Sequence, residues 1–191
     1  MWRRKLIVAL ALTALAGFCY WLPVIVTVHP ASHQDTVTDG EAVVAARLFE
    51  ENGVVSAGPV TRVIADPAGN THIATAMRHD HLPVFDEESL YHFNSQGRLY
   101  ALSTKAFETA GVTAQPRISM RSAAYRAVFR MRPHHSFESD LGFLDISRGS
   151  SESPKLVLAW RVRPASESYY PVMYINARTG RILIFDDGVR F

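Results

Sequence analysis

The pattern of apolar and polar residues predicts two similar halves, each with one helix followed by strands. In the first half, Thr38 and Glu41 have the spacing of a capping box, which begins a helix, and Asn52-Gly53 is a typical helix end. A strand pattern follows this helix, and His81-Leu82-Pro83 is expected to interrupt it after residue 77. Runs rich in β-branched and aromatic residues, separated by turn residues, predict strands over residues 60–65, 71–77, 89–93 and 98–102.

The second half repeats this order. Ser119 is placed to cap a helix that continues to about Arg132, and Pro133 ends it. Residues 134–154 contain a serine- and glycine-rich stretch, Ser147-Arg148-Gly149-Ser150-Ser151, which is expected to form a loop. Because strands follow helices without βαβ alternation, we predict an α+β fold of two helix-plus-antiparallel-sheet units. Alternating apolar side chains and turn residues place the strands of the second unit at residues 155–163, 171–175 and 181–185.

An uncharged stretch near the N-terminus, residues 6–28, predicts a transmembrane helix. At about 1.5 Å per residue it reaches roughly 34 Å, which is enough to cross about 30 Å of hydrocarbon. Arg3-Arg4-Lys5 precedes it, so the positive-inside rule places the N-terminus in the cytoplasm. We therefore expect a single-pass protein of the bacterial inner (cytoplasmic) membrane with a periplasmic domain. The alternative is a signal peptide cleaved after Ala14-Leu15-Ala16.

Composition narrows the function classes. Apolar residues make up 48% of the chain and charged residues 20%, as is usual for a folded protein. The formal net charge of +2 depends on Arg3-Arg4-Lys5, because the rest has 17 Lys and Arg against 18 Asp and Glu. We therefore expect no clustered basic face and no nucleic-acid partner. Cys19 is the single cysteine, which excludes an internal disulfide and any zinc site built on several thiolates.

Residues that could carry chemistry are few. His79 and His81, or His134-His135, could ligate a metal, but the sequence offers no third ligand, so we predict no metal and no cofactor. Asp86-Glu87-Glu88 lacks the spacing of a calcium loop and is expected to be a solvated loop. The sequence has no nucleophile elbow and no glycine-rich phosphate loop. These observations favour a protein that is not an enzyme.

Three aromatic residues in the second unit are candidates for partner binding. Tyr169 and Tyr170 precede Pro171 at the start of a predicted strand. If they are exposed they form a binding patch, and if they are buried they close the sheet. Trp160 lies in the middle of a predicted strand, where a core position competes with a role in binding.

The second unit resembles the PepSY domain. Trp160-Arg161-Val162 is followed by Tyr174-Ile175-Asn176-Ala177-Arg178-Thr179-Gly180-Arg181, which is similar to the hairpin of that family, with Asn176 in place of the more usual aspartate. The first unit resembles the FTP domain, a propeptide module of fungalysin- and thermolysin-type metallopeptidases. The matching residues are His72-Ile73, Leu82-Pro83-Val84-Phe85, Leu90-Tyr91-His92-Phe93 and Gly97-Arg98-Leu99-Tyr100.

The resemblance implies the order FTP then PepSY, as in these propeptides, but without the peptidase. The His-Glu-x-x-His motif of such a peptidase does not occur. The chain departs from the FTP pattern at Ala74, Ala76 and Met77, where Arg and Gln are more usual. The expected organisation is a cytoplasmic tip and anchor at 1–28, a linker at 29–37, an FTP-like unit at 38–104, a connector at 105–117 and a PepSY-like unit at 118–191.

The resemblance also implies a function. In propeptides of this kind the module assists folding of the peptidase and inhibits it until removal. We therefore expect a non-enzymatic, membrane-anchored binding protein that modulates an exported metallopeptidase in trans. The alternative is an adaptor or regulatory subunit of an envelope membrane complex, with an envelope protein as its partner and the PepSY-like sheet as its protein-binding module.

Overall fold

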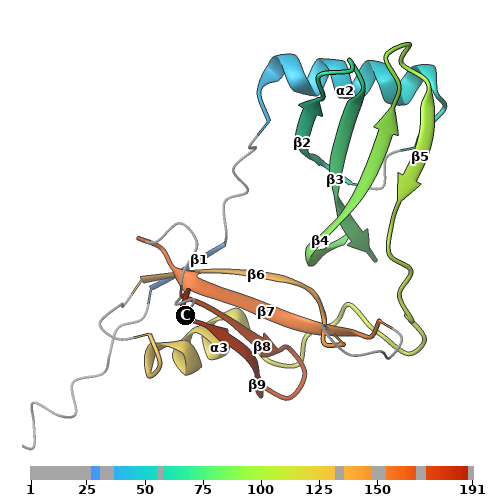
Figure 1. The fold of residues 1–191 in the computed structure, drawn as a ribbon. Helices are drawn as coiled ribbons and strands as arrows, with labels where there is room; N and C mark the ends of the chain where they lie inside the picture. The colour runs from blue at the N-terminus through green and yellow to red at the C-terminus, as the bar shows by residue number, and fades with distance from the viewer. Residues whose placement is uncertain are drawn as a thin grey trace, which may run out of the picture.

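The computed structural model describes residues 27–30, 37–55, 58–131, 136–147, 154–166 and 171–188, which contain two helices and nine strands (Figure 1). The helices are α2 (Asp39–Glu51) and α3 (Met120–Val128). The strands are β1 (Thr27–Pro30), β2 (Val60–Ala65), β3 (Thr71–His79), β4 (Leu82–Phe93), β5 (Leu99–Ser103), β6 (Ser136–Asp145), β7 (Leu156–Pro164), β8 (Val172–Asn176) and β9 (Ile182–Asp186).

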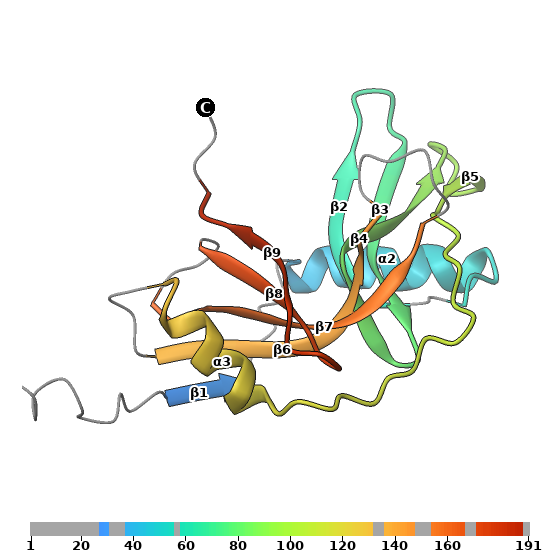
Figure 2. The ribbon, with the colours of Figure 1, turned by 90° about the horizontal axis from the view of Figure 1, so that it is seen from below.

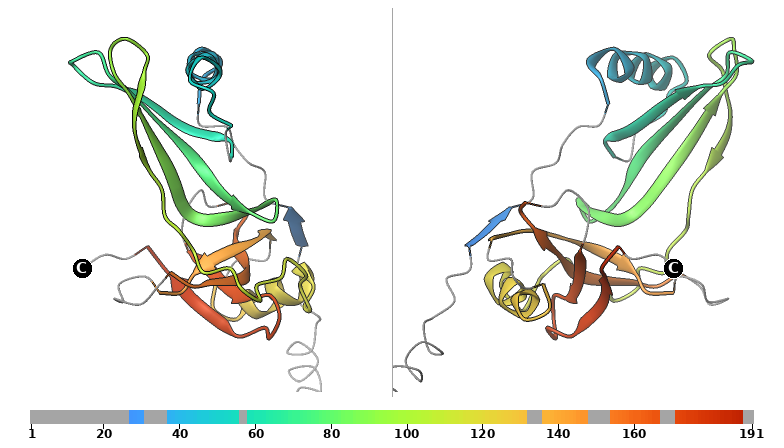
Figure 3. Two further views of the ribbon diagram at one scale, coloured as in Figure 1. Left: turned by 90° about the vertical axis from the view of Figure 1, so that its right-hand side faces the viewer. Right: turned by 60° about the vertical axis from the view of Figure 1, so that its left-hand side comes forward.

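In the first half, α2 covers one face of the strands β2 to β5 (Figures 1 and 3). The helix begins with the predicted capping box, in which the Thr38 side chain accepts from the Glu41 amide and the Glu41 carboxylate accepts from the Thr38 amide. It ends as predicted at Asn52, and Gly53 follows with a positive φ of 64°. The core between helix and strands consists of Ala45, Leu48, Phe49, Ile73, Tyr91 and Phe93.

In the second half, α3 covers one face of the strands β6 to β9 (Figure 2). Ser119 caps this helix as predicted, but the helix ends at Val128 instead of near Arg132. Its small side chains let it approach the strands closely. The core beneath it consists of Ala123, Ala124, Ala127, Val128, Met131, Phe137, Val162, Met173 and Ile175.

The prediction of two separate antiparallel sheets is wrong. All nine strands belong to one mixed sheet in the order β2-β3-β4-β6-β7-β8-β9, with β5 beside β4 and β1 beside β6. Two of the pairs, β1 with β6 and β4 with β6, are parallel. The central strand β6 was not predicted from the sequence. Ser147, the first residue of the expected loop, lies in a turn after β6, and residues 148–151 lie outside the described residues. Below, the first sheet means β2 to β5, and the second sheet means β1 and β6 to β9.

The two sheets join because β4 is much longer than the strand predicted at residues 89–93. Asp80 and His81 both have positive φ and form a tight turn directly after β3. The chain therefore returns at once as a strand, and Pro83 pairs with Arg78 inside it instead of interrupting it. At this first part of β4, Val84 pairs with Phe143 of β6, so one strand serves both sheets.

The predicted transmembrane helix over residues 6–28 and the membrane location derived from it are also corrected. Residues 6–26 lie outside the described residues, whereas Thr27 and Val28 belong to β1 and pair with Ser136 and Phe137. Val28 packs against the core beneath α3, so protein contacts account for its apolar side chain. In the described part of the chain, no helix combines the length and the apolar character that crossing a bilayer requires.

Candidate functional site

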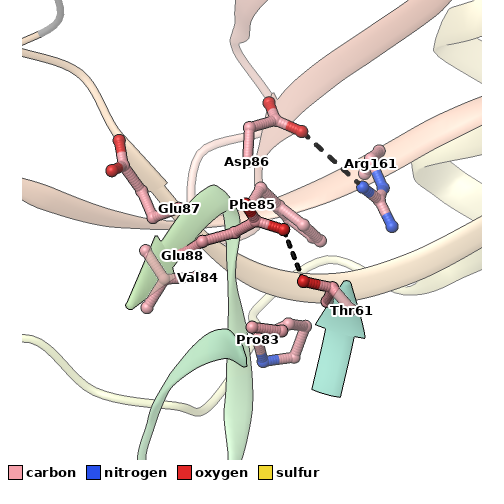
Figure 4. Close-up of a pocket in the computed structure, with 9 residues that line it drawn as sticks. Thr61, Pro83, Val84, Phe85, Asp86, Glu87, Glu88 and Arg161 are labelled. Carbon is pink, nitrogen blue, oxygen red and sulfur yellow. Dashed lines mark hydrogen bonds and ion pairs between the residues drawn. The ribbon is translucent and has the colours of Figure 1, made fainter. Parts of the chain in front are cut away.

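A pocket of about 300 Å³ lies where β4 passes from the second sheet to the first (Figure 4). Its walls come from β2, β3, β4 and β7. It combines apolar side chains with three carboxylates and one guanidinium. The lining residues are Thr61, Ala76, Pro83, Val84, Phe85, Asp86, Glu87, Glu88 and Arg161.

Asp86 marks the point at which β4 changes its partners. It has a φ of 59° in the middle of a strand, a conformation that side chains other than glycine rarely adopt. The second sheet holds it there: the Tyr174 hydroxyl donates to Asp86 Oδ2 at 2.8 Å, and Arg161 Nη1 lies 4.0 Å from Asp86 Oδ1. Backbone strain of this kind persists only where the surrounding contacts fix it.

Arg161 lines the pocket from β7. Its guanidinium lies 4.6 Å from the centre of the Phe85 ring, and it donates from Nε and Nη2 to Asp140 at 3.1 and 2.7 Å. Burial alone would lower the pKa of Arg161, but the hydrogen bonds and charge of Asp140 outweigh burial and raise it. The guanidinium is therefore a permanent charge that ties β7 to β6 and supports Phe85.

The two neighbouring carboxylates of β4 are also engaged. Glu88 accepts from the Thr61 hydroxyl at 2.5 Å, and Glu87 lies 3.2 Å from Lys105 Nζ. The acidic run of residues 86–88 is thus part of a strand with donors around it, and the prediction of a solvated loop is wrong. The arrangement holds β4 in place, because Glu87 faces Lys105 and Glu88 also faces Arg62 at 3.3 Å.

Lys105 links the connector to both sheets, because its ammonium group also lies 2.5 Å from Asp145 Oδ2 at the end of β6. The Asp145 side chain is fully buried and accepts further hydrogen bonds from the backbone and side chain of Ser147. Burial would raise the pKa of Asp145, but the hydrogen bonds from Lys105 and Ser147 outweigh it and lower the pKa to about 2. Asp145 is therefore an ionised carboxylate that holds Lys105 in place at the junction. By the junction we mean the region where β4 passes from the second sheet to the first.

The junction is also tightly packed around Gly142 of β6. A Cβ atom at this position would lie 2.6 Å from both the carbonyl oxygen of Pro83 and the ring of Phe85. Only glycine allows β4 to approach β6 this closely. Together with the contacts of Asp86, Arg161 and Lys105, this close approach fixes how the two sheets meet.

Beside the pocket lies a face of the first sheet that we call the uncovered face. Its side chains alternate with those that pack on α2, so they point the other way. In the described part of the chain no helix lies over this face (Figure 3). Through Ala76 and Glu88 the face continues into the pocket. It consists of Arg62, Ile64, His72, Ala74, Ala76, Glu88, Leu90 and His92.

Of the three aromatic residues that the sequence analysis singled out, Trp160 belongs to the described part of the chain. Trp160 lies on the α3 side of the second sheet, where it packs against the core and its indole Nε1 donates to the Ile118 carbonyl at 3.0 Å. Tyr169 and Tyr170 lie outside the described residues. The role of these residues in partner binding stays a prediction.

Two of the candidate metal ligands, His79 and His81, belong to the described residues, and neither lines the pocket. His79 packs its ring on Phe143 at a centroid distance of 5.0 Å, and His81 forms the turn after β3. His134 and His135 lie outside the described residues. Within the described ranges, no group of three His, Cys, Asp or Glu side chains is placed to hold a metal ion.

The sequence analysis did not identify the contact between Asp86 and Tyr174 beside the pocket. Asp86 and Tyr174 are 88 residues apart, and no local pattern announces their hydrogen bond. One signal was present: Phe137, Leu141 and Phe143 alternate with polar residues, as expected for a strand. Recognising β6 would have predicted a neighbour for β4 or β7.

Known proteins offer few matches to this chain. No protein-family model matches this chain. No curated protein matches it either. Among solved structures, the chain is similar to the Bacillus megaterium YpeB C-terminal domain, with a TM-score of 0.41 and 10% sequence identity over 83% of this chain and 68% of that chain. A likeness at this TM-score carries no argument about fold or function.

Proposed function

We propose that this chain is a non-enzymatic binding protein that receives a partner protein on the uncovered face of the first sheet, next to the junction pocket. The observation that carries the proposal is an open sheet face that continues into a pocket with fixed walls. A preformed surface loses little conformational freedom on binding, which favours affinity.

Two exposed apolar side chains offer area for such a contact, one on the uncovered face and one beside it. Ile64 on the edge strand β2 is 46% exposed, and Tyr100 on β5, whose ring lies 6.1 Å from that of His92, is 58% exposed, whereas Ala74 of the uncovered face is buried. Exposed aliphatic and aromatic side chains that lie close together on a rigid surface are typical of protein interfaces. Arg62 and Glu88 would supply a polar rim beside them.

The charges of the pocket are balanced within the chain. Asp86 lies 4.0 Å from Arg161, Glu87 lies 3.2 Å from Lys105, and Glu88 lies 3.3 Å from Arg62. Because each carboxylate already faces a cation, we expect the partner to contact the apolar part of the lining, Pro83 and Val84.

The contacts of the pocket suit binding better than catalysis. Asp86, Glu87 and Glu88 contact Tyr174, Lys105 and Thr61 respectively, so these carboxylates act as braces of β4. General acid–base chemistry would instead need a carboxyl group poised to exchange a proton with a substrate. The resemblance of the chain to propeptide modules makes a metallopeptidase the first partner to test, with inhibition or assisted folding as the effect.

Photo-crosslinking in cells of the source organism tests this proposal. A photoreactive amino acid replaces Ile64 on the uncovered face, and in a matched control it replaces Val43, which is 69% exposed on α2. We expect a metallopeptidase to be captured from position 64 and not from position 43. The purified chain should then lower the activity of that peptidase or raise its refolding yield.

Two outcomes would count against the proposal. Capture of the same proteins from both positions would mean that the uncovered face has no specific partner. Capture of subunits of one complex from position 64, without any peptidase, would retain the docking face but replace peptidase modulation by an adaptor role.

A further inference from the structure

We propose that His72 and His92 form a proton-controlled latch on the uncovered face of the first sheet. The two residues are direct partners in the β3–β4 pairing, and their side chains point to the same face. The Nδ1 atoms of the two rings lie 2.8 Å apart. The ring centres are 5.0 Å apart, and the angle between the ring planes is 70°. This is a side-chain hydrogen bond that bridges two neighbouring strands.

The geometry limits how many protons the pair can hold. A hydrogen bond between two Nδ1 atoms needs one proton between them, so one ring donates and the other offers its lone pair. When a single extra proton binds, His72 can carry both of its N–H groups and still donate to His92. When a second proton binds, neither Nδ1 has a lone pair left, and two positive rings face each other across a hydrogen-bond distance. The contact must then break.

The surroundings favour the first proton and not the second. Asp66, in the turn between β2 and β3, places Oδ2 3.5 Å from His72 Nε2. Hydrogen bonds from Asn70 keep the pKa of Asp66 below its usual value, so it stays a carboxylate. That negative charge faces His72, whereas His92 faces the neutral phenol of Tyr100 on β5. The remaining neighbours in register are Ile64 and Ala101, which carry no charge.

The latch would act between about pH 5 and 8, where histidine side chains ordinarily change charge. At pH values above the second protonation step, the hydrogen bond between the two rings joins β3 to β4 and the uncovered face keeps its shape. At pH values below that step, one imidazole must turn away, so the shape and the charge of the face change together. The effect on partner affinity rests on the proposed function, because it requires the partner to dock on this face. The protonation steps do not, because they belong to the free chain.

Proton uptake can be followed by NMR of the ring nitrogens of the full chain, labelled at histidine, from pH 8 to 4 in the presence of EDTA. We expect His72 and His92 to titrate in two coupled steps, with the second at least tenfold higher in proton concentration than the first. In His92→Gln and in His72→Gln the remaining ring should titrate in a single step. His81, in the exposed turn after β3, is the matched reference and should titrate once in all three proteins.

Amide hydrogen exchange gives the second readout. In the wild-type chain, exchange of the β3 and β4 amides, corrected for intrinsic pH dependence, should accelerate on the order of tenfold through the second step. In His92→Gln it should not, since one charged ring next to Asp66 causes no repulsion. A single shared titration step in the wild-type chain would overturn the latch, and this result is decisive even if a variant fails to fold. Failure of the crosslinking experiment would leave both readouts unaffected.

Discussion

The two sheets share one plan but differ in what lies on their second face. Each has a helix on one face, α2 on the first sheet and α3 on the second. On its other face, the second sheet carries a buried cluster that includes Phe85 from β4, and its arginines pair with carboxylates. On its other face, the first sheet exposes Ile64 and carries the half-buried pair of His72 and His92.

We infer from this difference that the second sheet mainly stabilises the fold and that the first sheet provides the surface for binding. The second sheet and the junction supply buried apolar area and ion pairs that hold the shape. The first sheet is attached to the second through β4. It can therefore leave one face without a covering helix and still keep a fixed position relative to the second sheet. We therefore expect mutations at the junction to affect stability most, and mutations on the uncovered face to affect binding with little change in stability.

Gly142→Ala should have the largest effect on stability, because the added methyl group would lie 2.6 Å from a backbone carbonyl oxygen and from the Phe85 ring. We expect a loss of about 3 kcal/mol in the free energy of unfolding, measured by urea denaturation. Gly40→Ala in the first turn of α2, where a Cβ meets nothing within 4 Å, is the control and should be neutral or slightly stabilising. Equal stability of the two variants would mean that the junction is not closely packed.

Replacing Asp145 by Asn should have the next largest effect on the free energy of unfolding. Its pKa falls from 3.8 to about 2 in the folded chain, so its ionised form stabilises the fold above about pH 4. This contribution, about 2 kcal/mol from the pKa difference, is lost as the pH falls through 2. Urea unfolding of the wild type and Asp145→Asn should therefore differ at pH 7 and converge toward pH 2. Glu50→Gln on α2 should show no such convergence, and a constant gap for Asp145→Asn would contradict the account.

The smallest effect concerns a buried hydroxyl in each sheet. Among the described residues, Thr75 Oγ1 in the first sheet and Ser139 Oγ in the second are buried without a hydrogen-bond partner. Thr75→Val keeps the shape and removes the unpaired group, so it should stabilise by up to about 1 kcal/mol. Ser139→Ala should gain less because it also loses volume. Thermal unfolding of both variants checks this, and clear destabilisation by Thr75→Val would show that its hydroxyl is satisfied.

Local signals predicted much of the secondary structure. The capping box at Thr38 and Glu41 and the cap at Ser119 depend only on neighbouring residues, and both were found as expected. Strand β2 also has the predicted bounds. These elements are set by backbone capping and by β-branched side chains, which can be read over a few residues.

The long-range features could not be predicted in the same way. The union of the two sheets depends on the close approach of β4 to β6 at Gly142, and the sequence of β6 does not indicate which strand will approach it there. The pocket depends on Asp86, whose conformation is fixed by Tyr174 from the far end of the chain. The apolar character of Val28 suited a membrane as well as a core, and its contacts beneath α3 decide between them.

The most direct test of the central claim is the affinity of the purified chain for the peptidase captured from position 64, measured by calorimetric titration. Ile64→Asp places a charge on the uncovered face, and Val43→Asp places the same charge on the exposed side of α2. Our account predicts that Ile64→Asp weakens binding at least tenfold while Val43→Asp leaves it unchanged, with both variants folded by circular dichroism. Equal affinity of the two variants would contradict the assignment of the uncovered face as the docking site.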